Sequence, residues 1–244
     1  MILPIPAIDL IDGKCVRLTK GDYATEKVYN EDPAEVAKAF EDLGFPRLHL
    51  VDLDGARSKH VVNHHVLDRI ANHTNLTIDF GGGIKQDEDL RKAFDHGAAM
   101  VTLGSIAATS KDRVLAWAAQ FGSEHFIIGA DVQDEKIRIN GWQEEVPLML
   151  MDFIAGYHAE GLKKVLCTDI SHDGTLTGPS TALYQKVMQA FPDCGLIASG
   201  GVSGIDDLRA LDEAGVPEVV FGKAIYEGRI DLREVSKQYI QQDT

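Results

Sequence analysis

Two aspartates stand in similar surroundings in the two parts of this chain and could perform acid–base chemistry. Asp9 follows the apolar segment Pro6-Ala7-Ile8, and Asp131 follows Ile128-Gly129-Ala130; a stretch of alternating apolar and polar residues comes after each. Two carboxylates on opposite sides of a bound sugar suit a general acid and a general base, provided that their surroundings separate their pKa values. The alternative for each is an aspartate that caps a turn or pairs with an arginine.

Glycine-rich turns form a second repeated group. The stretch from Gly81 to Ser105 returns, shifted by 118 positions, as the stretch that ends at Gly222-Lys223. The identical pairs are Gly82 and Gly200, Gly83 and Gly201, Asp89 and Asp207, Leu90 and Leu208, Arg91 and Arg209, Gly97 and Gly215, Val101 and Val219, and Gly104 and Gly222. Glycines at strand ends bring backbone N–H groups close to a ligand, and a following helix N-terminus favours an anion. Turn formation alone is the simpler explanation, but the paired repeat predicts two phosphate cradles.

The charge of the chain limits its partners. The 244 residues carry a formal net charge of −14, which argues against non-specific binding of nucleic acid or of an anionic membrane. It also repels an anionic ligand at long range, so a phosphate must be bound by local donors. Lys85, Lys223 and Arg17 are the candidates.

Further polar residues follow two other strand-like segments. Asp52 and Asp169 end these segments, and Asp54-Gly55 and Asp173-Gly174 come shortly afterwards. They could orient substrate hydroxyl groups or could serve as caps and turns, and we favour the second role for Asp52 and Asp54.

Three other groups of residues have side chains that could do chemistry. Trp142 lies in a polar stretch and could anchor a loop or stack on a planar ligand ring. No metal site is expected, because no histidine joins the aspartates at a ligand-like spacing, and His60, His64 and His65 are expected to be solvated. The three cysteines Cys15, Cys167 and Cys194 lack metal-like spacing and are expected to be reduced, with nothing to activate Cys167 as a nucleophile.

A regular alternation of elements places all these residues. Short apolar segments, typical of strands buried on both faces, are expected at 2–8, 48–51, 76–80, 100–103, 126–130, 164–168, 196–199 and 219–221. Amphipathic helices are expected at 33–43, 63–71, 87–96, 111–121, 147–160, 181–190, 205–214 and 231–241. Eight strands alternating with eight helices predict a single α/β domain, a (β/α)8 TIM barrel. Small β-ribbons are expected at 13–18 and 135–142, and the repeat predicts two homologous half-barrels, 1–122 and 123–244.

Such a barrel has its ligand site at the carboxyl ends of the strands. Strands 1 and 5 face each other across it, so Asp9 and Asp131 are expected to flank a ligand. No run of 18 apolar residues and no targeting segment is evident in the sequence, and we expect a cytoplasmic protein. No exposed apolar run calls for a partner, so a monomer is expected.

Four motifs closely resemble the ProFAR isomerase family of histidine biosynthesis, and the resemblance covers essentially the whole chain. The motifs are Pro6-Ala7-Ile8-Asp9-Leu10-Ile11-Asp12-Gly13, Leu48-His49-Leu50-Val51-Asp52-Leu53-Asp54-Gly55-Ala56, Gly81-Gly82-Gly83-Ile84 and Thr168-Asp169-Ile170-Ser171-His172-Asp173-Gly174-Thr175. The resemblance implies an Amadori rearrangement of an aminoaldose with two phosphates to an aminoketose, without a cofactor.

The resemblance also implies a role for each site residue. Asp9 would be the base that removes the C2 proton, Asp131 the acid that protonates the ring oxygen, and Trp142 the stacking aromatic. Thr168 and Asp169 would contact the middle of the substrate. The phosphate sites would be Gly81, Gly82, Gly104 and Ser105 at one end, and Asp173, Gly174, Gly200, Gly201, Gly222 and Lys223 at the other.

One position departs from the family pattern, because Lys85 stands where the family commonly has arginine. Lysine keeps the charge but loses the bidentate fork, so the role of that arginine would be weaker here or be taken by Arg17. Three alternatives remain open: the cyclase subunit of imidazole glycerol phosphate synthase, an isomerase that also accepts phosphoribosylanthranilate, and a catalytically silent barrel that binds phosphorylated sugars or docks a partner.

Overall fold

Eight parallel strands close into a barrel in the computed structural model, which describes residues 1–19 and 21–241. The barrel strands are β1 Leu3–Ile11, β4 Arg47–Asp52, β5 Thr77–Gly81, β6 Met100–Leu103, β7 Phe126–Gln133, β10 Lys164–Asp169, β11 Gly195–Ser199 and β12 Glu218–Phe221. The ring closes because β7 pairs with both β6 and β10, and β1 pairs with both β12 and β4. The predicted TIM barrel is therefore confirmed.

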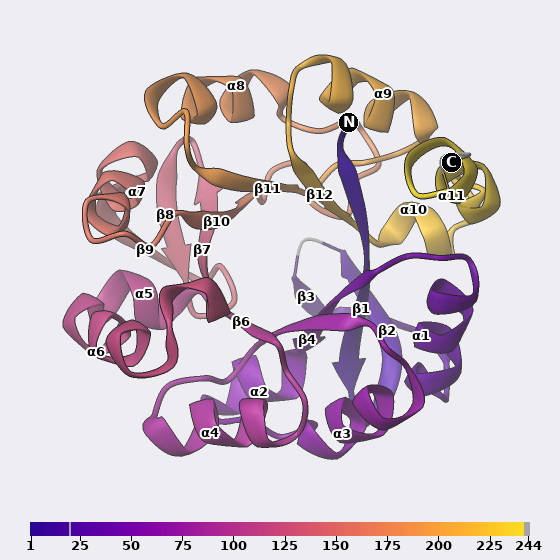
Figure 1. Ribbon diagram of the computed structural model, residues 1–244, viewed down its shortest axis with the longest axis horizontal. Helices are drawn as coiled ribbons and strands as arrows, with labels where there is room; N and C mark the ends of the chain where they lie inside the picture. The colour runs from indigo at the N-terminus through magenta and orange to yellow at the C-terminus, as the bar shows by residue number, and fades with distance from the viewer. Residues whose placement is uncertain (20, 242–244) are drawn as a thin grey trace.

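The helices form an outer ring around these strands (Figure 1). The longer ones are α1 Pro33–Asp42, α3 His64–His73, α4 Asp87–Asp95, α6 Lys111–Phe121, α7 Leu150–His158, α8 Thr181–Ala190, α9 Ile205–Glu213 and α11 Leu232–Tyr239. Helix α1 begins as its sequence predicts, because the Asp32 carboxylate accepts a hydrogen bond from the Ala34 N–H and Pro33 occupies the first helical position.

One helix begins later than its sequence predicts. The segment expected to be helical from Pro147 is extended up to Met149, and α7 starts only at Leu150. Residues Glu144–Met149 form β9, which pairs antiparallel with β8 Lys136–Ile139. Sheet pairing with the ribbon thus replaces the first turn of the expected helix.

Three short helices were not predicted, and each follows a barrel strand directly. They are α2 Leu53–Ser58, α5 Ser105–Thr109 and α10 Lys223–Tyr226; a 3₁₀ turn, η1, spans Ser123–His125. Helices of four to six residues are too short to show a 3.6-residue period, so periodicity could not reveal them.

Both predicted ribbons are present and extend beyond their expected bounds. After β1 come β2 Lys14–Thr19 and β3 Asp22–Asn30, and after β7 come β8 and β9. The ribbons continue β1 and β7 past the barrel, with Asp9 opposite Val16 and Val132 opposite Ile137. Each ribbon therefore lies beside the aspartate that precedes it.

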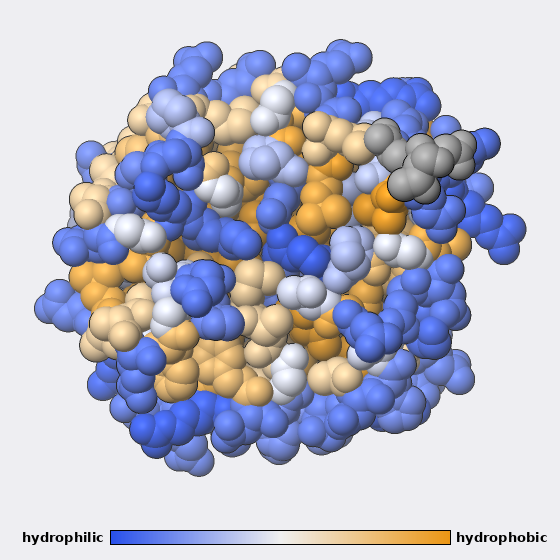
Figure 2. Space-filling view, viewed as in Figure 1, coloured by the Kyte–Doolittle hydropathy of each residue, from blue (hydrophilic) through white to orange (hydrophobic). Residues whose placement is uncertain are grey.

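The core has two layers, as a barrel of this kind requires. A large cluster fills the space between strands and helices, and a small one, Ile5, Ala7, Met100, Ile127, Leu166, Ile197 and Val220, fills part of the barrel interior. Figure 2 shows hydrophilic residues around the outer rim of one face, with hydrophobic residues between them and further hydrophilic residues at its centre. Within the described residues, no helix is long and apolar enough to cross a membrane.

Candidate active site

A cavity of about 280 Å³ lies at the carboxyl ends of the barrel strands. Every site residue predicted from the sequence lines it, with the exception of Asp169. These residues are Asp9, Arg17, Gly81, Gly82, Lys85, Gly104, Ser105, Asp131, Trp142, Thr168, Asp173, Gly174, Gly200, Gly201, Gly222 and Lys223. Residues from both halves of the chain thus meet at one site.

Asp9 is paired with a guanidinium group. Arg17, on the neighbouring strand β2, donates from Nη1 to the Asp9 carboxylate at 2.7 Å and from Nη2 to the Ala7 carbonyl at 2.7 Å. The Tyr226 ring lies 5.3 Å from the Arg17 guanidinium carbon. Arg17 was predicted to bind phosphate, whereas in this structure it holds Asp9.

Gly222 makes this position of Arg17 possible. A Cβ atom on Gly222 would stand 1.7 Å from Arg17 Nη2, although the backbone φ of −144° would permit any residue. The requirement for glycine here therefore comes from the packing of Arg17, in addition to any approach of a ligand to the backbone.

Asp131 has neutral hydrogen-bond partners. Trp142 Nε1 donates to its carboxylate at 2.9 Å, and the Thr168 hydroxyl, on the paired strand β10, also bonds to it. Burial disfavours the charged form and raises the pKa of Asp131, against the opposing effect of these two hydrogen bonds and of the charge on His49. Asp131 is therefore suited to hold a proton.

Trp142 also joins the two ribbons. Its backbone has a left-handed φ of +70°, and a Cβ atom on Gly21 would lie 2.9 Å from the Trp142 ring. The ring thus packs against Gly21, immediately before β3. Of the two interpretations of Trp142, the structure supports the loop anchor, and stacking on a ligand stays a prediction.

The first glycine turn is packed tightly against the loop that follows β4. A Cβ atom on Gly82 would lie 2.1 Å from the Asp52 carbonyl oxygen, and one on Gly83 would lie 2.5 Å from the His60 carbonyl oxygen; both have positive φ. Turn geometry therefore requires glycine at both positions. Lys85 faces the same part of the cavity, where burial and the charge of Lys59 lower its pKa. A bound anion would oppose both effects, because it stabilises the charged amine.

The second glycine turn has the corresponding packing. A Cβ atom on Gly200 would lie 3.0 Å from the Asp169 carbonyl oxygen, and one on Gly201 would lie 2.2 Å from the Gly178 carbonyl oxygen. Lys223 donates to the Gly174 carbonyl at 2.7 Å and to the Thr19 hydroxyl at 3.0 Å. Lys223 therefore bridges the loop after β10 and the first ribbon at this end of the cavity.

Asp173 lies beside these donors. Burial raises its pKa to about 6, the charges of Arg17 and Lys223 oppose that rise, and the charges of Asp9 and Asp131 add to it. A carboxyl group that protonates near pH 6 can tolerate an adjacent phosphate better than one that is always charged.

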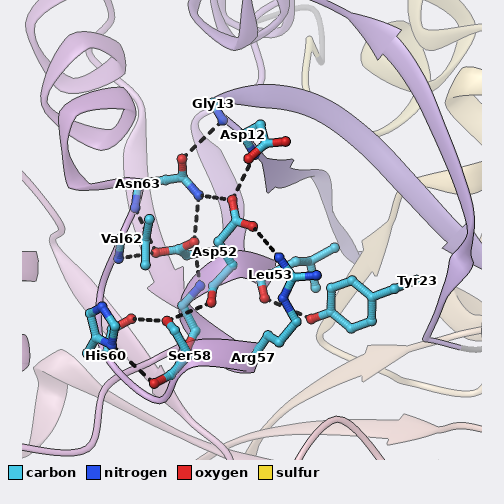
Figure 3. A network of polar contacts seen from close by, with 12 residues as sticks. Asp12, Gly13, Tyr23, Asp52, Leu53, Arg57, Ser58, His60, Val62 and Asn63 are labelled. Carbon is cyan, nitrogen blue, oxygen red and sulfur yellow. Dashed lines mark hydrogen bonds and ion pairs between the residues drawn. The ribbon is translucent and has the colours of Figure 1, made fainter.

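Asp52 and Asp54 serve as structural caps, as the sequence favoured. Asp52 accepts hydrogen bonds from the backbone N–H groups of Gly55, Val62 and Asn63, and the Asn63 amide bridges Asp52 and Asp54 at 2.7 and 2.9 Å (Figure 3). Asp54 also accepts from the Asp12 N–H at 2.7 Å. This network ties the loop after β4 to the turn between β1 and β2.

Asp169 plays the same part in the second half of the chain. Its carboxylate accepts hydrogen bonds from the Ser171 N–H at 3.0 Å and from the Ser171 and Ser180 hydroxyls. These partners belong to the loop after β10, which explains why Asp169 does not line the cavity. The structure does not place its side chain beside the middle of a substrate.

His49 is the main residue of the cavity that sequence reasoning missed. It is 6% exposed, lies on β4 and lines the cavity. The sequence did contain a clue to this position, because a histidine inside the apolar run Leu48-His49-Leu50-Val51 is expected to be buried. Val51, two positions later on the same face of the strand, lines the same cavity.

Within the described residues, no group of three or more histidines, cysteines or acidic residues could hold a metal ion. Cys15, Cys167 and Cys194 are buried and unpaired, and burial raises the pKa of the Cys167 thiol well above its usual range. Cys167 is also absent from the cavity lining, so the structure offers no activated thiol among the residues it describes.

Similar sequences occur among known proteins. The family described as "Histidine biosynthesis protein" matches residues 4–231. The chain is 60% identical over 237 residues to a protein of Phocaeicola vulgatus, covering 97% of this chain and 99% of that protein. It is 57% identical to a protein of Parabacteroides distasonis, covering 96% and 98%, and 52% identical to one of Flavobacterium johnsoniae, covering 97% and 98%. All three are named 1-(5-phosphoribosyl)-5-((5-phosphoribosylamino)methylideneamino)imidazole-4-carboxamide isomerase.

Proposed function

The chain belongs to the histidine biosynthesis protein family, and we infer that it is a ProFAR isomerase, the enzyme named in these relatives. The substrate named there carries two phosphoribosyl groups. The observation that carries the assignment is 60% identity along nearly the whole of both chains. A cavity with one aspartate on each side and a glycine turn at each end suits such a ligand.

We propose that Asp131 begins the reaction as a general acid. Burial raises the pKa of its carboxyl group, which is the direction that a general acid requires. It gives its proton to the ring oxygen of the aminoaldose while the C1–O bond breaks, and the nitrogen lone pair forms a C1=N⁺ bond. The ring opens without a metal because the proton neutralises the charge that develops on oxygen.

Asp9 then acts as the general base. As a carboxylate paired with Arg17 it can accept the C2 proton, and the electrons of the C2–H bond neutralise the iminium to give an enaminol. Tautomerisation completes the rearrangement, because C1 gains a proton and the C2 hydroxyl loses one to become the ketone. The two carboxyl groups thus need opposite protonation states at the start.

The two phosphates are proposed to bind at opposite ends of the cavity. One end has Gly81, Gly82, Gly104, Ser105 and Lys85, and these come from β5, β6 and the turns that follow them. The other end has Gly200, Gly201, Gly222, Lys223 and Gly174, from the regions of β10, β11 and β12. Strands β5 and β6 lie opposite β11 and β12 in the ring, so a ligand with a phosphate at each end would span the mouth.

We further propose that the protein works as a monomer in the cytoplasm and consists of two half-barrels, 1–122 and 123–244. The large hydrophobic residues exposed in the structure are Met1, Val28 and Met149, which lie far apart in the sequence. Light scattering of the purified protein at micromolar concentration tests the monomer, and a mass twice that of the 26.7 kDa chain would refute it.

The activity is tested by an absorbance assay with ProFAR coupled to the next enzyme, run in parallel with phosphoribosylanthranilate. We expect turnover of ProFAR. Turnover of both substrates would identify a dual-specificity isomerase. Turnover of neither, with consumption of the ketose product when ammonia is supplied, would identify a cyclase instead.

A further inference from the structure

A row of buried polar side chains runs along the inside of strands β4 and β5. His49 Nδ1 bonds to Asp79, and Arg47 bonds to Asp79 at 3.4 Å and also to Glu218. Thr102, on β6, donates to Asp79 at 3.1 Å. Asp79 is 1% exposed, and Arg47 is 7% exposed. The row extends from the start of β12 to the floor of the cavity.

His49 reaches the cavity from this row, together with Thr102 at its edge. The charged members Arg47, Asp79 and Glu218 do not line it. A carboxylate can only accept hydrogen bonds, so the nitrogen that faces Asp79 must carry a proton. The other nitrogen, Nε2, then remains for a ligand, as a donor when the ring is charged and as an acceptor when it is neutral.

The equivalent positions in the second half of the chain are apolar. Shifts of 117 and 118 positions place Leu166 where the first half has His49, Ile197 where it has Asp79, and Val220 where it has Thr102. All three pack in the small cluster inside the barrel. Apolar residues therefore fill this layer well, and the polar row is not a requirement of the fold.

We propose that Asp79 is a positioning residue that keeps His49 doubly protonated, so that Nε2–H donates a hydrogen bond to an oxygen atom in the middle of the sugar-phosphate substrate. This rests on the proposed isomerase activity, because it assigns a donor between the two aspartates that the reaction uses. His49 would touch the substrate, and Asp79 would act only through His49.

The charges around His49 support this assignment. Burial disfavours the imidazolium, but the charge and hydrogen bond of Asp79 and the charge of Asp9 outweigh it, so the pKa of His49 is raised even though the charge of Arg17 opposes it. Asp131 also interacts with His49, and Arg47 forms ion pairs with both Asp79 and Glu218. The charged donor thus persists to a higher pH than in an ordinary histidine and is lost as pH rises through its pKa.

The pH profile of kcat tests the coupling. The Asp79→Asn variant keeps the shape of the side chain and removes its charge, so we expect the alkaline limb of kcat to move down by about one pH unit or more. At a fixed pH on that limb, kcat would fall about tenfold for each pH unit that the limb moves. Near the acidic end of the profile, activity should return toward that of the original protein.

Glu218→Gln is the matched control, because it removes the other carboxylate bound to Arg47 and leaves the contact between Asp79 and His49. Its alkaline limb should stay in place. A purely structural role for Asp79 would lower kcat evenly at all pH values without moving the limb, and that result would overturn the proposal.

An NMR titration of the 15N-labelled imidazole rings tests the charge of His49 without any need for turnover. In the unmodified protein, His49 should remain doubly protonated above about pH 6.5, the ordinary pKa of a histidine. A His49 that becomes neutral at or below that pH would overturn the proposal, even if Asp79→Asn fails to fold. If ProFAR is not turned over while His49 titrates high, the isomerase assignment fails and the coupling to Asp79 stands.

Discussion

The two aspartates of the site occupy equivalent positions but have different partners. Each precedes a ribbon, and Lys14 and Lys136 stand at the same distance after Asp9 and Asp131. Three residues later the first ribbon has Arg17, which pairs with Asp9, and the second has the buried Ile139. Asp131 instead receives hydrogen bonds from uncharged groups, and burial raises its pKa. Two aspartates at matching positions of the sequence are thus given different surroundings by the residues beside each carboxyl group.

The largest effect is expected when either carboxyl group is removed. Asp9→Asn and Asp131→Asn should each lower kcat by about 10²- to 10⁴-fold, the usual range for general acid–base catalysis. Binding of a bisphosphate product analogue should change little, since the glycine turns remain. Steady-state kinetics and calorimetry check the two expectations, and near-normal turnover in either variant would remove that residue from the mechanism.

A second pair of variants compares equivalent glycines. Gly104→Ala should change stability by less than about 0.5 kcal/mol, because no atom lies within 4 Å of the new Cβ. Gly222→Ala should destabilise by about 1–3 kcal/mol, the usual cost of overpacking, because its Cβ would displace Arg17 from Asp9. Urea unfolding of both variants measures the difference.

The kinetic consequence of Gly222→Ala follows from the same displacement. We expect kcat to fall about tenfold or more if Asp9 needs Arg17 for its position. Equal stability losses in the two glycine variants would show that Arg17 simply moves aside, and the comparison between the two halves would lose this support.

Trp142→Phe separates the anchor role from the hydrogen bond to Asp131. The indole hydrogen bond holds the pKa of Asp131 down, so its loss should raise that pKa further. An acid with a raised pKa stays protonated to a higher pH, so the step of the pH profile at which Asp131 ionises, which is separate from the step assigned to His49, should move upward. The direction is opposite to that expected for Asp79→Asn, and a pH profile distinguishes the two.

Much of the fold could be predicted because its signals are local. The strands of the barrel are short apolar runs, and the start of α1 at Asp32-Pro33 follows from capping and from the fixed φ of proline. The boundary of α7 could not be predicted, since Pro147 suggested a helix start whereas pairing of β9 with β8 decided the conformation. Long-range pairing overrides local preference in such a segment.

The residues predicted from the sequence line one cavity, with the exception of Asp169, but the sequence could not predict their contacts. Strand order places Asp9 and Asp131 at one mouth, whereas the pairing of Arg17 with Asp9 depends on the register between β1 and β2. The family resemblance implies that Asp169 contacts the substrate, yet the serines of its own loop donate hydrogen bonds to its carboxylate. His49 was overlooked because it lies inside a strand, where an apolar run hides a single polar residue.

Asp173 and Asp54, each just before a glycine in the loops after β10 and β4, offer the smallest and most specific test. Asp54 accepts hydrogen bonds from Asp12 and Asn63, whereas burial raises the pKa of Asp173 to about 6. In the unfolded chain an aspartate has a pKa of about 3.9. The stability that Asp173 contributes is therefore fully present below about pH 4 and is lost as pH rises through about 6.

The change in the free energy of unfolding caused by Asp173→Asn should therefore be more favourable at pH 8 than at pH 4.5. We expect a difference of about 1–2 kcal/mol, less than the full separation of the two pKa values implies, because the side chain is only partly buried. Asp54→Asn is the control and should destabilise at both pH values, since it disturbs a satisfied network. Urea unfolding of both variants at pH 4.5 and pH 8 measures these changes. A stability change in Asp173→Asn that does not depend on pH would mean that Asp173 is charged throughout, and its carboxylate would then repel the phosphate proposed to bind beside it.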